Sequence, residues 1–122
     1  MRNDDARYLR DLPAELEKMG TKLLQDIRRW HNGGLIYHES SRKYVETPNF
    51  WTVVIQKQDL SLRITVYGLP DSFFYRGNKI VIKNDRGSYS SFKINHMYQV
   101  DDAISVIRES YEMKKRKQDH FW

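Results

Sequence analysis

The side chains able to perform metal or nucleophile chemistry are few and scattered. The sequence has four histidines, His31, His38, His96 and His120, and no cysteine. None of the histidines forms an HxH or HExxH pair, the spacings that bring two imidazoles onto one metal ion. The lack of cysteine excludes disulfides, cysteine-ligated zinc, iron–sulfur clusters and thiol catalysis. GxSxG, Walker and GxGxxG patterns are also absent from the sequence, so we expect no enzyme, no metal and no other cofactor.

A metal-dependent nuclease of the restriction type is the nearest catalytic alternative. Such a site needs an acidic residue and then a Glu or Gln two positions before a Lys on a strand. In this chain Gln56 and Lys57 are adjacent, and the β-rich middle carries only Asp59, Asp71 and Asp85, all near predicted turns. The sequence therefore disfavours hydrolytic metal catalysis.

Basic residues close to aromatic ones are the more informative pattern. The net charge is +5, and the excess lies in residues 49–95, with 7 basic and 3 acidic residues, against 9 and 8 before this segment and 5 and 5 after it. Aromatic rings that stack on bases, together with cations that neutralise phosphates, are typical of single-stranded nucleic-acid binding. The alternative is that these rings only pack in the core or on the sheet. The predicted nucleic-acid contacts are Arg63, Tyr67, Tyr75, Arg76, Lys79, Lys83, Arg86, Tyr89 and Lys93.

Large apolar side chains offer a second functional hypothesis, a contact with a protein partner or with a second copy of the chain. The run Lys114–Lys117 near the C-terminal end could hold phosphate or an acidic partner, or be a solvated helix end. Salt separates the two hypotheses, because phosphate contacts weaken steeply with ionic strength. The predicted interaction residues are Trp51, Phe73, Phe74, Phe121 and Trp122.

Two helices are predicted to flank the β-rich middle. Apolar residues at steps of three and four indicate a helix from Pro13 to His31, with Asp11 as its N-cap and Asn32-Gly33-Gly34 as its end. The second helix runs to about Lys117. Its apolar face carries Val100, Ala103, Ile104, Ile107 and Tyr111.

The strands are predicted from β-branched and aromatic runs at residues 35–37, 43–45, 50–56, 60–67, 79–83 and 91–94. Along residues 60–67, alternation places Leu60, Leu62, Ile64 and Val66 on the core face and Arg63, Thr65 and Tyr67 on the opposite face. The expected fold is one α+β domain over residues 1–122, in which an antiparallel sheet of four to five strands packs against an N-terminal and a C-terminal helix. Residues 1–10 and 118–122 are expected to be frayed tails.

The sequence gives no sign of membrane attachment. No run approaches the ~20 apolar residues that a membrane span needs, and the first residues are charged. A cytoplasmic location is therefore expected.

One further pattern combines the stretches Lys43 to Phe50, Val53 to Lys57 and Leu60 to Val66 with the helix from Val100 to Glu112. This pattern resembles an uncharacterised bacterial and archaeal family often labelled "predicted transport protein". The resemblance covers about residues 16–112. It implies a small α+β domain that occurs alone or attached to larger proteins, including ones of restriction or defence type, with no established catalytic residues. The loop from Leu69 to Asn78 departs from the family pattern.

Overall fold

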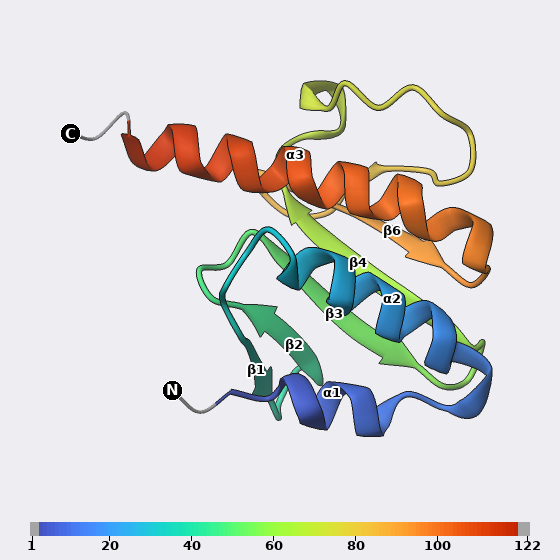
Figure 1. Ribbon diagram of the computed structural model, residues 1–122. Coiled ribbons are helices and arrows are strands. Elements are labelled where there is room, and N and C mark those ends of the chain that lie inside the picture. Colours follow the sequence, from blue (N-terminus) through green and yellow to red (C-terminus); the bar gives the residue numbers. More distant parts are fainter. Residues whose placement is uncertain (1–2, 120–122) are drawn as a thin grey trace.

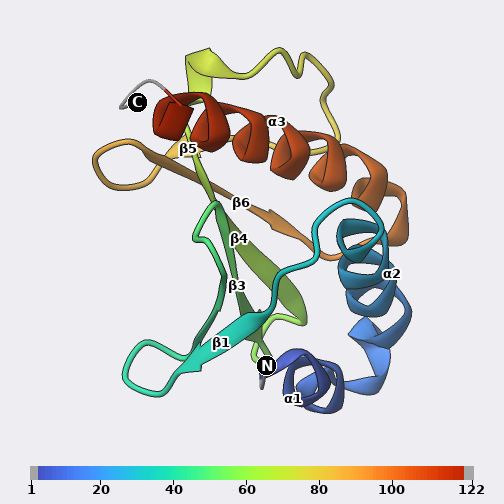
Figure 2. The same cartoon turned by 60° about the vertical axis from the view of Figure 1, so that its left-hand side comes forward.

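Six antiparallel strands form one twisted sheet, and the helices lie on one of its two faces (Figures 1 and 2). The computed structural model describes residues 3–119. The helices are α1 (Asp5–Asp11), α2 (Glu17–Arg28) and α3 (Val100–Asp119), with short 3-10 turns at Ala14–Leu16, Pro70–Ser72 and Met97–Gln99. The strands are β1 (Leu35–His38), β2 (Lys43–Glu46), β3 (Trp51–Gln56), β4 (Ser61–Tyr67), β5 (Lys83–Asn84) and β6 (Tyr89–Ile94). Their order is β1-β2-β3-β4-β6-β5.

The predicted α+β class, with an antiparallel sheet packed against N-terminal and C-terminal helices, is confirmed, although the sheet has six strands and not four or five. Its core lies on the helix face, where Val53, Ile64 and Phe92 stand side by side in register on β3, β4 and β6. The same register places Arg63, Thr65 and Tyr67 on the other face, as the alternation predicted. Leu60 is the exception, because it lies in the β3–β4 turn with φ 52 and is partly exposed.

The N-terminal segment differs from the expected frayed tail and single long helix. Residues 5–11 form α1, whose Tyr8 is fully buried and donates a hydrogen bond to the Gly20 carbonyl of α2 at 2.9 Å. Gly20 permits this approach, since a Cβ there would lie 2.6 Å from Leu12 Cδ2. Leu12 is extended because the residue before a proline avoids helical angles, so α1 ends at Asp11 and that residue does not cap α2.

Of the predicted strand at residues 79–83, only Lys83 is in a strand, β5, because side chains take over the backbone hydrogen bonds of the preceding residues. The Tyr75 hydroxyl accepts the amides of Lys79 and Ile80, at 3.2 and 3.4 Å, and Gln99 Nε2 donates to the Lys79 carbonyl at 2.9 Å. The segment before β5 is therefore held away from the ladder with β6, which leaves a groove between them.

Pairing along the sheet is uneven. β3 pairs with β4 over six residue positions, and β4 with β6 over six, whereas β2 and β3 share only Tyr44–Val53 and Val45–Thr52. We call this short contact the β2–β3 seam. None of the described helices is apolar over a length that would cross a bilayer.

Candidate nucleic-acid interface

The helices leave one face of the sheet uncovered (Figure 2), and we call it the open face. The strand register places Lys43, Arg63, Lys83 and Lys93 on it. The one acidic residue in the strands, Glu46, points to the helix face and is buried. Every charged side chain that the strands contribute to the open face is therefore basic.

Three of these cations, with Lys79, gather around the groove between β6 and the segment before β5. The groove has a volume of about 430 Å³. We call it the basic groove. Its lining residues are Arg63, Lys79, Ile80, Val81, Lys83, Ser91, Phe92, Lys93 and Gln99.

The acidic neighbours of the basic groove fix two of its four cations. Arg63 Nη2 lies 2.8 Å from Asp85 Oδ1 and donates to Ser91 Oγ at 3.3 Å. Lys93 Nζ lies 2.9 Å from Asp59 Oδ2, and the Ser61 hydroxyl followed by Lys93 lowers the pKa of the Asp59 carboxyl. Within residues 3–117, no carboxylate lies within 4.0 Å of Lys79 or Lys83, so both exposed ammonium groups stay available to a ligand.

Two of the predicted stacking residues, Tyr67 and Tyr89, lie opposite each other on the open face. Their ring centroids are 5.6 Å apart at an interplanar angle of 78°. Lys114 Nζ lies 4.5 Å from the Tyr67 centroid and donates to Tyr89 Oη at 3.3 Å, and Lys117 Nζ lies 5.2 Å from the Tyr67 centroid. The two rings are therefore on the predicted face, with lysines of α3 against them.

Other predicted contacts lie away from the open face. Tyr75 donates to Asp102 Oδ2 of α3 at 2.6 Å, and desolvation together with this hydrogen bond raises the pKa of the Tyr75 hydroxyl. Arg76 donates to the carbonyls of Phe73 and Tyr75, so its guanidinium stays with its own loop. Arg86 is exposed in the turn between β5 and β6. Tyr75 and Arg76 therefore do not lie on the sheet face, because contacts with α3 and within the loop hold them away from it, and their contact with nucleic acid stays a prediction.

The predicted apolar interaction residues differ in how far they are buried. Trp51 is fully buried and its indole Nε1 donates to Glu46 Oε1 at 2.9 Å, and Phe73 is buried in the core. These two residues therefore stabilise the fold and cannot contact a partner. Phe74 is 84% exposed and remains a candidate contact. Phe121 and Trp122 lie outside the described residues.

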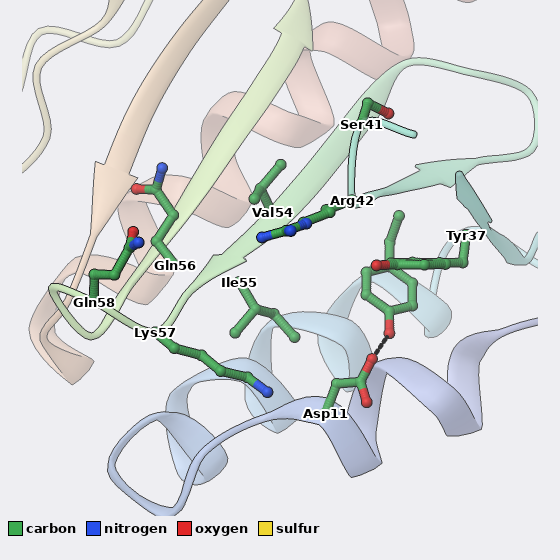
Figure 3. Close-up of a pocket in the computed structure, with 10 residues that line it drawn as sticks. Asp11, Tyr37, Ser41, Arg42, Val54, Ile55, Gln56, Lys57 and Gln58 are labelled. Carbon is green, nitrogen blue, oxygen red and sulfur yellow. Dashed lines mark hydrogen bonds between the residues drawn. The ribbon is translucent and has the colours of Figure 1, made fainter. Parts of the chain in front are cut away.

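A second hollow, with a volume of about 460 Å³, opens where β2 diverges from β3 beyond the β2–β3 seam (Figure 3). Arg42 and Lys57 reach it from different elements, and the Tyr44 hydroxyl donates to Asp11 at its α1 side. Desolvation and this hydrogen bond raise the pKa of Tyr44. None of its lining residues is among the predicted site residues, since the divergence of β2 has no local signal.

Comparison with known proteins adds no family. No protein-family model, curated protein or solved structure matches the chain. The resemblance to the "predicted transport protein" family stays a prediction. In the part of the chain that the structure describes, no three His, Asp or Glu side chains are grouped so that they could hold a metal ion.

Proposed function

We propose that the protein is a non-enzymatic binding module that contacts the phosphates of a nucleic acid through the open face. The observation that carries the proposal is that the strands contribute only basic charge to that face, through Lys43, Arg63, Lys83 and Lys93, while two turn carboxylates, Asp59 and Asp85, pair with two of these cations. Phosphate contacts by Lys and Arg supply most of the affinity of sequence-independent binding.

The basic groove is the centre of this surface. Asp85 pairs with Arg63, and Asp59 with Lys93, so each carboxylate orients its cation and also offsets part of its charge. Lys79 and Lys83 extend from the opposite side of the groove and are exposed. A phosphate in the groove would therefore meet two positioned cations and two mobile ones.

Salt-dependent binding tests the proposal. Fluorescence anisotropy of labelled single-stranded and duplex DNA and RNA is measured at 50 and 200 mM salt. If all four groove cations contact phosphates, the logarithm of the affinity for a single strand falls against the logarithm of salt with a slope of about −3.

The double variant Lys79→Gln/Lys83→Gln should weaken binding and reduce that slope by about 1 to 2. The matched control is Arg10→Gln/Lys18→Gln, which removes the same charge from exposed positions on α1 and near the start of α2. Absence of binding at 50 mM salt, or equal losses in the two double variants, would contradict the proposal.

Phe74 favours a second candidate function, contact with a protein partner or with another copy of the chain. Its ring is 84% exposed, and Leu69, at 46%, lies nearby in the same loop. An apolar contact of this kind keeps its strength at high salt. Sedimentation of the protein and of Phe74→Ser at 500 mM salt tests it, with a fall in molecular mass of the variant as the expected result.

A further inference from the structure

The basic run of α3 lies at one end of the open face. Figure 1 shows the C-terminal half of α3 passing the end of β4, where Tyr67 lies. Lys114 and Lys117 both approach the Tyr67 ring, and Lys114 also donates to the Tyr89 hydroxyl. We call these four residues the tyrosine–lysine cluster.

The basic groove and the tyrosine–lysine cluster are aligned along the same two strands. Arg63 pairs with Lys93 and Tyr67 with Tyr89, so the two sites are four residues apart on both β4 and β6. At about 3.3 Å per residue, this separation is roughly 13 Å. Thr65, which is buried, and Ser91, which is half-buried and accepts a hydrogen bond from Arg63, lie between the sites, so no large side chain from β4 or β6 stands between them.

We propose that a single strand of nucleic acid lies along β4 and β6, with phosphates in the basic groove and at Lys114 and Lys117. This inference rests on the proposed function and adds the class of ligand and its path. An unpaired base would stack on the Tyr67–Tyr89 pair, whereas the bases of a duplex are stacked on one another and cannot reach the rings. The bound length is about four nucleotides, at the low end of the range for small sheet domains.

In this arrangement the Lys114 side chain can lie either on the Tyr67 ring or beside a bound phosphate. In the free protein its ammonium group lies on the half-buried Tyr67 ring and donates to Tyr89 Oη. A base that stacks on the same ring must displace this ammonium group, which then lies beside the phosphate of the same nucleotide. The cluster therefore offers both a stacking surface and a cation to the same nucleotide.

Oligothymidylates of two, four and eight nucleotides, and a duplex of the same length as the longest, test the path. The variants are Lys114→Gln/Lys117→Gln and, as a matched control, Lys18→Gln/Lys115→Gln. For the eight-nucleotide strand, the first variant should lose about tenfold in affinity and the control about twofold or less. For the dinucleotide, which reaches only one site, Lys114→Gln/Lys117→Gln should cost at most about threefold.

Combination with Lys79→Gln/Lys83→Gln separates the two proposals. The losses of the groove and cluster variants should multiply on the eight-nucleotide strand, because each removes phosphate contacts from a different site. If the groove variant weakens binding and Lys114→Gln/Lys117→Gln does not, the path is wrong and the proposed function stands. If the duplex binds as tightly as the single strand, the ligand class is wrong. If wild-type protein binds neither, the proposed function fails as well.

Discussion

Arg28 and Glu46 form a two-point ion pair where α2 meets β2, with Nη1–Oε1 at 2.7 Å and Nη2–Oε2 at 3.2 Å. The same guanidinium binds Asp5 of α1 through Nε at 2.8 Å and Nη2 at 3.0 Å. Glu46 also accepts hydrogen bonds from the Trp51 indole and from the Thr47 amide. One arginine therefore joins α1, α2 and β2.

Replacement of Glu46 by glutamine should destabilise the fold. The amide keeps an acceptor for the Trp51 indole but leaves Arg28 without half of its compensating charge. We expect a loss of about 3 kcal/mol in the free energy of unfolding, measured by urea denaturation at pH 7. The exposed substitution Glu15→Gln should change it by less than about 0.5 kcal/mol. Similar values for the two variants would show that the ion pair does not stabilise the fold.

The free energy of unfolding should decrease in acid, partly because Asp5 becomes protonated. Burial alone would raise the pKa of the Asp5 carboxyl, but the hydrogen bonds from Arg28 and from the Leu35 amide lower it below its ordinary value near 3.8. A carboxylate whose pKa is lower in the folded state stabilises that state above its unfolded pKa, and this stabilisation is lost as the pH falls through the folded pKa. Asp5→Asn should therefore be clearly less stable than wild type at pH 7, with a smaller difference at pH 3. A difference that does not change with pH would contradict this assignment.

Gly33 should not tolerate a side chain. A Cβ at this position would lie 2.5 Å from the Thr47 carbonyl oxygen and 2.6 Å from Glu46 Oε2, neither of which has room to move. Gly33→Ala should cost about 2 kcal/mol in the free energy of unfolding. The neighbouring Asn32→Ala, at an exposed position, should cost less than about 0.5 kcal/mol. Equal thermal midpoints for the two variants would argue against the close packing of Gly33 on β2.

Phe73 and Phe74 are adjacent in sequence, but replacing them should change the free energy of unfolding by very different amounts. Phe73 is 1% exposed and Phe74 is 84% exposed. Phe73→Ala should destabilise the protein by about 4 kcal/mol, and Phe74→Ala by less than about 0.5 kcal/mol, in the same urea titration. Comparable losses would mean that the loop after β4 does not bury Phe73 as described.

The elements with strong local periodicity could be predicted from the sequence. Alternation along residues 60–67 identified the two faces of β4, and the apolar stripe from Val100 to Tyr111 identified α3. The short helix α1 could not be predicted in this way, since a helix of this length is unstable by itself and depends on distant contacts, Tyr8 with Gly20 and Asp5 with Arg28.

Only part of the candidate site could likewise be predicted from local sequence patterns. Arg63 and Lys93 follow from strand alternation, which needs only neighbours in sequence. The placement of Tyr75 depends on Asp102, 27 residues away, and the approach of Lys114 to Tyr67 depends on how α3 crosses the sheet. Such relationships between distant segments leave no pattern in a single sequence.

The β2–β3 seam divides the sheet into parts whose backbone amides we expect to exchange at different rates. The β1–β2 hairpin is attached to β3 through two residue pairs, whereas β4 shares six with each of its neighbours. Opening the hairpin must also break the contacts of Glu46 with Arg28 and of Tyr44 with Tyr8. We therefore expect the amide hydrogens of Tyr44 and Val45 to exchange only moderately faster than those of Ile64 and Phe92, which lie between two fully paired strands. Most of the open face, including Arg63 and Lys93, belongs to the part of the sheet that we expect to exchange most slowly.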